Sequence, residues 1–338
     1  MSLQAYISAL AYYLPEKTED NELNRLTKKT GIYHRHIATE NECASDLALK
    51  AAEKLFSNNM IEKESIDFLL LCTQSPDYVL PTTACILQDK LGLPKTIGAF
   101  DFNLGCSGYI YGISMAQGLI ETGQARNVLL LTAETYSKYI NRQDNTVRPL
   151  FGDAATATLI TGKESESKGI KGITFGTDGS GYKNLIVPMG AQKVHYDESL
   201  IKEEQDKYGN VRTNANLYMN GAAISNFALE VVPDMLVAIL NKCKMSKEDI
   251  DYYVFHQANK FILKFLQEKC GLLDQPYWND VSNYGNTVSN SIPIALVDMM
   301  AVSKAKVCNN VMVLGFGVGL SWAGCILDLS EIKKLKKV

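Results

Sequence analysis

The sequence predicts an α/β protein built from two halves that repeat one order of helices and strands. Apolar residues at helical spacing alternate along the chain with short strand-like apolar runs, the pattern of α/β architecture. Residues 63–72 (KESIDFLLLC) also line up without gaps with residues 247–256 (KEDIDYYVFH). Each segment is followed by a helical stretch, a glycine-containing turn, a further helix and a strand. Such a repeat predicts a duplicated fold with a shared central cleft, although short helix–strand segments also match by chance.

The expected elements follow from this periodicity. The first half, residues 1–170, is expected to hold helices at 44–56, 84–91 and 107–121 and strands at 67–72, 97–102 and 127–132. In the second half, residues 171–338, we expect a helix at 258–270 and a strand at 311–314. A polar, glycine-containing insertion occupies about 183–216; it is either a solvated excursion or a cap over the cleft.

Composition excludes several classes of protein. The chain has 338 residues, 34 Lys+Arg against 37 Asp+Glu, and 46% hydrophobic residues, which are ordinary globular values. A net charge of −3 gives no reason to propose nucleic-acid or membrane binding. The longest apolar stretches, such as 128–131 and 311–314, have the length of strands, and the C-terminal lysines at 333–337 indicate a solvated tail. The N-terminus lacks a secretory signal, so a cytoplasmic location is expected.

Cysteine and histidine spacing argues against disulfides and metals. None of the eight cysteines forms a C-x-x-C pair or lies with histidines at zinc-finger spacing. A disulfide framework is not expected in a chain of this size without a signal peptide. His34 and His36 alternate along an extended stretch, but further ligands for a metal are missing, and His195 lies in the polar insertion. We therefore expect no metal site and mostly buried, reduced cysteines.

Cys106 is the candidate nucleophile. It follows a strand and opens a helix rich in small residues, so the positive end of the helix dipole is expected to favour the thiolate. That placement suits covalent acyl transfer, although a buried inert cysteine gives the same pattern.

Two further polar residues are expected near it, because the internal repeat places His256 at the end of a strand and Asn286 in the turn equivalent to that of Cys106. A histidine at a strand end is often structural, and Asn is also a common turn residue. The alternative role for Asn286 is donation to a developing negative charge. Residues 315–319 (GFGVG) are expected to form a flexible turn between two strands where backbone N–H groups approach a substrate.

Together these segments resemble the beta-ketoacyl-[acyl-carrier-protein] synthase III family of the thiolase superfamily over nearly the whole chain. The motifs that carry the resemblance, in order, are TGI at 30–32, RHIA at 35–38, DFN at 101–103, CSGY at 106–109, FGDAA at 151–155, MNG at 219–221, HQAN at 256–259, NYGNT at 283–287, SIP at 291–293 and GFG at 315–317. The resemblance implies a five-layered αβαβα fold and a homodimer.

The resemblance also implies a mechanism. Cys106 takes an acyl group from a thioester, and a malonyl thioester then loses CO2 and condenses with it, while His256 and Asn286 stabilise the enolate. The backbone N–H groups of Cys106 and Val318 would form the oxyanion hole, and Phe316 would shield the site. No cofactor or metal is implied; the substrates are acyl-CoA or acyl-carrier-protein and malonyl-carrier-protein.

Some positions depart from the family pattern. A Trp and an Arg that sandwich the adenine of coenzyme A in the family fall here on Arg25 and Asn145, and Arg148 is displaced by three positions. The primer is therefore expected on a carrier protein, or coenzyme A is gripped differently. Lys260 is the plausible carrier-docking residue. Leu80 falls where the family places a pocket-floor side chain from the partner subunit, and it leaves room for a longer or branched acyl chain than Phe would.

Two alternatives remain open at this point. One is a homologue in specialised metabolism that joins unusual acyl units or transfers an acyl group to oxygen or nitrogen. The other is a catalytically silent partner subunit, which would typically lack Cys106 or its His256 and Asn286 pair. Primer length and branching, the donor and the pathway served do not follow from the sequence.

Overall fold

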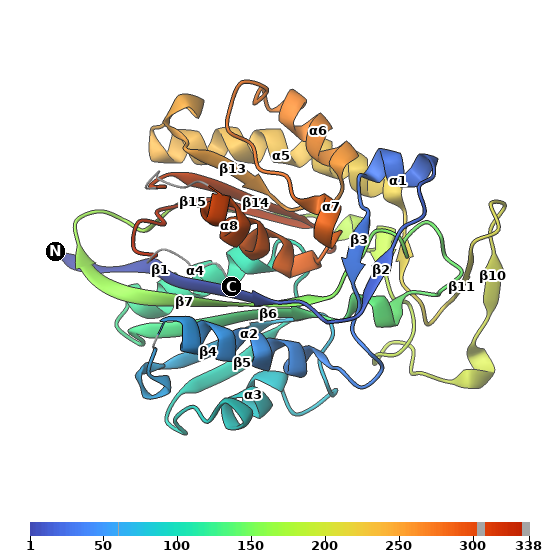
Figure 1. The fold of residues 1–338 in the computed structure, drawn as a ribbon, viewed down its shortest axis with the longest axis horizontal. Coiled ribbons are helices and arrows are strands. Elements are labelled where there is room, and N and C mark those ends of the chain that lie inside the picture. The colour runs from blue at the N-terminus through green and yellow to red at the C-terminus, as the bar shows by residue number, and fades with distance from the viewer. Residues whose placement is uncertain (60, 303–307, 333–338) are drawn as a thin grey trace.

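The chain folds around two β-sheets, shown in a computed structural model that describes residues 1–59, 61–302 and 308–332 (Figure 1). The lysine-rich tail at 333–337 lies outside the described residues. The first sheet has the order β1-β7-β6-β4-β5 and the second the order β13-β14-β15-β8. The strands of the first sheet are β1 (Ser2–Tyr13), β4 (Phe68–Cys72), β5 (Gly98–Phe102), β6 (Asn127–Glu134) and β7 (Ala154–Ser165). Those of the second are β8 (Ile170–Thr177), β13 (Tyr252–Phe255), β14 (Val311–Gly317) and β15 (Ser321–Leu327).

The two sheets share one topology. β4 pairs in parallel with β6, and β6 pairs antiparallel with β7, which pairs antiparallel with β1. β13, β14, β15 and β8 repeat this order and these directions. A parallel bridge between Tyr253 and Tyr277 stands where β5 stands in the first sheet. The repeat in the sequence is therefore also a repeat of strand order.

Helices cover and separate the sheets. On the outer face of the first sheet lie α2 (Ala44–Asn59) and α3 (Thr83–Leu91). Between the sheets lie α4 (Gly108–Glu121) and α8 (Ser291–Val302), and on the outer face of the second sheet lie α5 (Gly221–Cys243) and α6 (Lys260–Lys269) (Figure 1). The expected five-layered αβαβα arrangement is confirmed. One apolar core surrounds the middle helices and contacts both sheets, and two further cores lie under the outer helices.

Short elements connect these layers. They are α1 (Arg25–Thr30), α7 (Val281–Tyr284), the strands β2 (Thr18–Asp20), β3 (His34–His36), β9 (Leu185–Ile186), β10 (Glu203–Gln205), β11 (Val211–Thr213) and β12 (Tyr218–Met219), and the 3-10 turns η1 (Lys63–Ser65), η2 (Tyr136–Tyr139), η3 (Gly179–Asn184), η4 (Glu198–Leu200), η5 (Lys247–Asp249) and η6 (Val288–Asn290). The aligned K-E openings form equivalent turns, η1 and η5, before β4 and β13.

The glycine-rich segment at 315–319 differs from the expected turn. Gly315 and Gly317 lie inside β14, and the chain turns only at 318–320. The reason is close packing, because a Cβ on Gly315 would lie 2.6 Å from the carbonyl oxygen of Cys106. Glycine here lets the strand touch the turn that carries Cys106.

Helix α5 is the longest apolar element and was not expected from the sequence. Among the described residues it is the one helix with the length and hydropathy of a membrane span, with 23 residues and a mean hydropathy of 1.7 over its most apolar 18. Its buried residues pack on β8, β14 and β15 of the second sheet. They are Phe227, Ala228, Val232, Met235, Leu236, Ile239 and Leu240.

Candidate active site

Cys106 lies in the turn between β5 and α4 and is 5% exposed. A Cβ on Gly317 would lie 2.9 Å from its Sγ, so β14 passes directly beside the sulfur. The backbone N–H groups of Cys106 and Val318 both donate to Sγ. Two backbone donors therefore converge on the sulfur.

The thiol of Cys106 is protonated in the free protein. Burial, together with the charge of Glu134, raises its pKa to about 12 against the lowering effect of the two N–H groups. The expectation that the helix dipole favours the thiolate is wrong for this state, since burial outweighs it. Helix α4 itself begins only at Gly108.

His256 directly follows β13 and is 2% exposed. Its Nδ1 lies 2.7 Å from Oγ of Ser291, an oxygen that also accepts the N–H of Gln257 at 3.3 Å. The hydroxyl hydrogen is thus free for donation to Nδ1, and in that arrangement the ring proton is on Nε2. Burial lowers the pKa of His256 to about 3, so the imidazole is neutral, and its ring meets Phe316 edge-on at 5.5 Å.

Asn286 is held at three points. Its Oδ1 accepts the N–H of Val288 at 2.9 Å. Its backbone N–H donates to Leu150 O at 2.8 Å, and its carbonyl accepts the N–H of Gly152 at 3.0 Å, which forms a parallel bridge with residue 151. Nδ2 forms no hydrogen bond with other described residues and remains a free donor.

Cys106, His256 and Asn286 line one cavity of about 690 Å³. Phe316 and Gly317 are also in its wall. The structure thus brings together the three residues that the sequence singled out from both halves. Their catalytic roles stay predictions, developed below.

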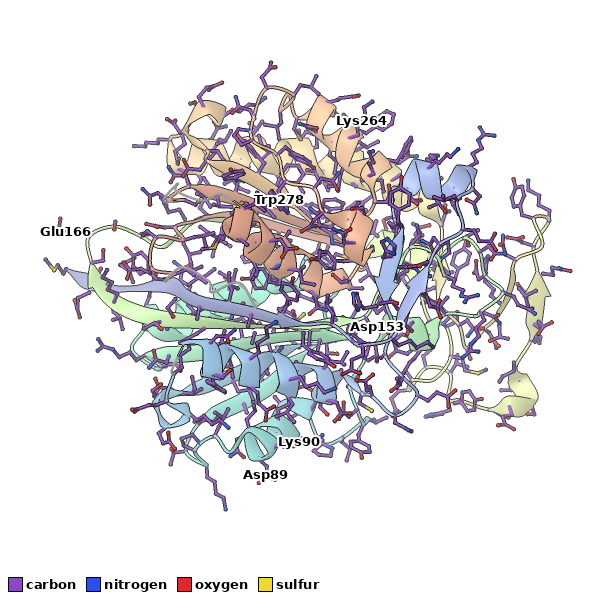
Figure 2. All side chains as sticks on the ribbon, in the orientation of Figure 1. Asp89, Lys90, Asp153, Glu166, Lys264 and Trp278 are labelled. Carbon is purple, nitrogen blue, oxygen red and sulfur yellow. The ribbon has the colours of Figure 1, made fainter. Side chains whose placement is uncertain are left out.

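The other predicted residues lie outside the wall of this cavity. Lys260 is exposed at the start of α6, and a Cβ on Gly31 would lie 2.7 Å from its Cβ. Its neighbour Phe261 lines the cavity, and Nζ of Lys29 lies 4.1 Å from the centroid of the Phe261 ring. Lys264, one turn along α6, is exposed on the outer surface (Figure 2). Leu80 is 79% exposed and does not line the cavity of its own chain.

The polar insertion contributes part of the cavity wall. Asp206, Tyr208 and Arg212 line the cavity. Arg212 is fixed by Asp144, with Nε 2.9 Å from a carboxylate oxygen. The rest of the insertion, including the β10–β11 hairpin that projects from the molecule in Figure 1, is largely exposed. The interpretation of the insertion as a purely solvated loop is therefore wrong for residues 206–212.

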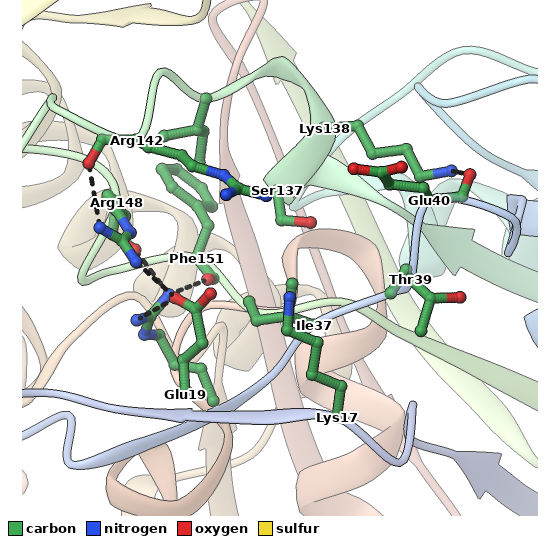
Figure 3. Close-up of a pocket in the computed structure, with 13 residues that line it drawn as sticks. Lys17, Glu19, Ile37, Thr39, Glu40, Ser137, Lys138, Arg142, Arg148 and Phe151 are labelled. Carbon is green, nitrogen blue, oxygen red and sulfur yellow. Dashed lines mark hydrogen bonds and ion pairs between the residues drawn. The ribbon is translucent and has the colours of Figure 1, made fainter.

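The residues at the positions of the family's coenzyme A sandwich lie outside this cavity. Neither Arg25 nor Asn145 lines it. Arg148 lines a separate cavity of about 630 Å³, where it donates to Glu19 at 3.2 Å and to Arg142 O at 3.0 Å (Figure 3). Arg35 donates to the same Glu19 carboxylate, whose pKa is lowered by both arginines against the effect of burial. The guanidinium of Arg148 is thus already engaged.

Several residues of the site were missed by sequence reasoning. Ser291 positions His256, and Tyr136 lines the cavity. Glu134 is fully buried and acts on the thiol of Cys106. Ser291 was quoted only as part of a family motif, and nothing local in the sequence distinguishes the other two from core residues. Within residues 1–59, 61–302 and 308–332, no group of three or more His, Cys, Asp or Glu side chains is arranged to hold a metal ion.

Comparisons with known proteins agree with this arrangement. The family model described as 3-Oxoacyl-[acyl-carrier-protein (ACP)] synthase III matches residues 100–179, and that of its C-terminal part matches residues 240–329. The chain is 34% identical to a beta-ketoacyl-[acyl-carrier-protein] synthase III of Caldanaerobacter subterraneus, covering 97% of this chain and 99% of that one. It is 37% identical to the Clostridium perfringens protein of the same name, covering 89% of each.

Solved structures give the same result. A crystal structure of a 3-oxoacyl-(acyl-carrier-protein) synthase III superposes with a TM-score of 0.93 at 45% identity, over 96% of this chain and 99% of that one. A 3-oxoacyl-(acyl-carrier protein) synthase from Burkholderia xenovorans gives a TM-score of 0.88 at 33% identity, over 100% of this chain and 97% of that one. The chain belongs to the 3-oxoacyl-[acyl-carrier-protein] synthase III family.

Proposed function

We propose that this chain is a condensing enzyme of the beta-ketoacyl-[acyl-carrier-protein] synthase III type, which initiates fatty-acid synthesis. The observation that carries the proposal is the meeting of Cys106, His256 and Asn286 in one cavity, with two backbone donors at the sulfur. The neutral imidazole and the free amide supply hydrogen-bond donors, and the cysteine supplies a nucleophile. Every group that the reaction needs is then supplied by the protein and its thioester substrates.

In the first half-reaction Sγ of Cys106 attacks the carbonyl carbon of an acyl thioester. The oxygen of the tetrahedral intermediate accepts hydrogen bonds from the N–H groups of Cys106 and Val318. The C–S bond of the donor then breaks, and the proton from the Cys106 thiol passes to the departing sulfur. The products are acyl-Cys106 and the free thiol of the carrier.

In the second half-reaction a malonyl thioester loses CO2, and the electron pair of the broken C–C bond forms an enolate. Its oxygen accepts from Nε2–H of His256 and Nδ2–H of Asn286, each worth roughly 3 kcal/mol of barrier in a dry site. The enolate carbon attacks acyl-Cys106 and a 3-oxoacyl thioester leaves. The Cys106 thiolate then takes one proton from solvent, which restores the thiol.

The partner subunit is proposed to be a second copy. β5 is an edge strand of the first sheet, and Tyr78, Val79 and Leu80 are 62%, 84% and 79% exposed. An open strand edge beside exposed apolar residues supports pairing with another chain. In that homodimer Leu80 would form the floor of the partner's acyl pocket.

The carrier is proposed to dock at the cavity mouth. Lys260, Lys29 and Lys264 are exposed on α1 and α6, next to the cavity wall at Phe261. These cations support binding of an acyl carrier protein through acidic residues. A carrier-bound primer is favoured over coenzyme A because Arg148 is held by Glu19 and two positions of the adenine sandwich are changed.

The division into halves and the cellular location are also proposals. Residues 1–170 supply the nucleophile, and residues 171–338 supply His256, Asn286 and the insertion. The two strand orders support that boundary, since β7 ends at 165 and β8 begins at 170. The kinship with bacterial synthases supports a cytoplasmic enzyme.

Intact-protein mass spectrometry with a panel of acyl-CoA and acyl-carrier-protein thioesters tests the function. We expect an acyl adduct on the native protein and none on Cys106→Ala. Adducts from carrier-bound donors alone would support the carrier proposal, whereas equal adducts from acyl-CoA would contradict it. No Cys106-dependent adduct from any donor would overturn the function and favour a catalytically silent partner subunit.

A further inference from the structure

Glu134 is a fully buried carboxyl group that the proposed reaction does not use. It ends β6, and its two oxygens accept the backbone N–H of Gln74 at 3.1 and 3.2 Å. One oxygen also accepts the hydroxyl of Ser75 at 3.0 Å, and the other that of Ser289 at 3.3 Å. A single side chain is thus bonded to segments from both halves of the chain.

Gln74 connects this carboxyl to the turn that carries the nucleophile. A Cβ on Gly105 would lie 2.7 Å from Oε1 of Gln74 and 2.4 Å from Cγ1 of Val318. The side chain of Gln74 is itself fixed, because Oε1 accepts the hydroxyl of Tyr136 at 2.7 Å and Nε2 donates to Asn103 at 2.9 Å. Gln74 therefore packs against the residue before Cys106, beside one of the two oxyanion donors.

Ser289 connects the same carboxyl to the second half of the site. It lies in η6 between Val288 and Asn290. The N–H of Val288 holds Oδ1 of Asn286, and Val288 has a positive φ of 56°. A left-handed β-branched residue is costly, so the surrounding contacts must impose this conformation.

We propose that Glu134 is a positioning residue: through Gln74 it holds the nucleophile turn, and through Ser289 it holds the loop that carries the enolate donor. It touches no reacting atom. Its influence on the two half-reactions rests on the proposed function, whereas its influence on the Cys106 thiol does not.

The charge state of Glu134 provides a measurable signature. Burial raises its pKa to about 8, against hydrogen bonds from Gln74, Ser75 and Ser289 that lower it. The carboxyl is therefore mainly neutral at pH 7 and ionises as the pH rises through 8. Titratable groups that interact with it in the described structure are Cys72 on β4, Cys106, Tyr136 and Tyr139 in η2, and Asp153 before β7. Its negative charge opposes formation of the Cys106 thiolate, so thiol reactivity should rise less steeply above pH 8.

Alkylation by iodoacetamide tests this without any substrate. Peptide mass spectrometry follows Cys106 in the native protein and in Glu134→Gln, with the exposed Cys85 as reference in the same sample. The Cys106 alkylation rate, normalised to that of Cys85, is compared between E134Q and the native protein. The ratio of the two rates should grow about threefold or more between pH 7 and pH 9, which corresponds to a shift of half a unit in the pKa of Cys106. A constant ratio would overturn the proposal.

A second variant keeps the test decisive if E134Q does not fold. Ser75→Ala removes one hydrogen bond from the carboxylate but leaves the carboxyl group, so the break in the alkylation profile should move to higher pH. An unchanged profile would contradict the role of Glu134.

The half-reactions test the positioning role. E134Q should lower kcat of condensation with KM little changed, because the positioned donors act mainly in the transition states. Ser289→Ala should lower condensation more than acylation. A rise in KM alone would contradict positioning. If the native protein formed no acyl adduct, the proposed function would be contradicted instead. The alkylation profile would still test the influence of Glu134 on the Cys106 thiol.

Discussion

Oγ of Ser291 lies 2.7 Å from Nδ1 of His256, so the hydroxyl group is hydrogen-bonded to the ring nitrogen that does not face the cavity's proposed enolate. The N–H of Gln257 donates to the same hydroxyl oxygen, which leaves the hydroxyl hydrogen free for donation to Nδ1. When the hydroxyl donates to Nδ1, the ring proton is on Nε2, and this tautomer is the donor that the proposed enolate stabilisation requires.

Ser291→Ala should therefore lower the condensation rate by about tenfold while acylation of Cys106 proceeds, because only the second step needs the Nε2–H donor. Nitrogen-15 NMR of His256 would report the change in tautomer directly. Ser57→Ala, at an exposed position on α2, is the matched control. Equal loss in both half-reactions would show that Ser291 acts on the fold and not on the tautomer.

Gly317→Ala should slow acylation by about tenfold or more, because the new Cβ would lie 2.9 Å from Sγ of Cys106 and displace the nucleophile. The rate of acyl-adduct formation, followed by mass spectrometry of samples quenched at successive times, measures the effect. Gly118→Ala on α4 is the control, since no atom lies within 4 Å of its added Cβ. That control should acylate normally and gain up to about 1 kcal/mol of stability from helix propensity. Normal acylation by the Gly317 variant would contradict the close packing of β14.

Leu80→Phe should restrict the enzyme to short primers. Leu80 is exposed in the single chain, so its effect on the acyl pocket requires the proposed homodimer. Adduct formation across a series of acyl chain lengths should stop at a shorter chain in the variant than in the native protein. If both accept only acetyl, the specificity hypothesis fails.

The stability of the protein should depend on the neutral state of His256. Its pKa falls from 6.5 to about 3 on folding, so the unfolded chain binds a proton between these pH values and the folded chain does not. This contribution is complete above pH 6.5 and is lost as the pH falls toward 3. From pH 7 to pH 5, the unfolding free energy of the native protein should therefore fall by about 2 kcal/mol more than that of His256→Asn. If the unfolding free energies of the two proteins, measured with denaturant, changed equally between pH 7 and pH 5, the neutral state of His256 would be contradicted.

The layered fold and the convergence of three polar residues could be predicted because both depend on local patterns. Periodicity marks helices and strands, and the repeat at 63–72 and 247–256 places Cys106, His256 and Asn286 on equivalent elements. The charge state of Cys106 was predicted wrongly because burial is a property of the assembled layers. A helix terminus is visible in sequence, but the apolar surroundings that raise the pKa are not.

The supporting residues were missed for a related reason. Glu134 meets Ser289 from 155 positions away, and Ser291 meets His256 from 35 positions away. No period or motif within either segment encodes such a contact. Gly315 and Gly317 were noticed as glycines, yet their need to remain small comes from the Cys106 turn, which reaches β14 only in the folded chain.

The backbone bridge at Asn286 makes the geometry of the candidate site depend on contact between the two halves of the chain. Its N–H and C=O form hydrogen bonds with Leu150 and Gly152, so the proposed enolate donor is joined to the other half by main-chain hydrogen bonds. Separation of the halves would therefore break the site, so substrate access cannot involve separation of the two halves. The amide protons of Asn286 and Gly152 should exchange with solvent only in the same global opening that exposes the sheets.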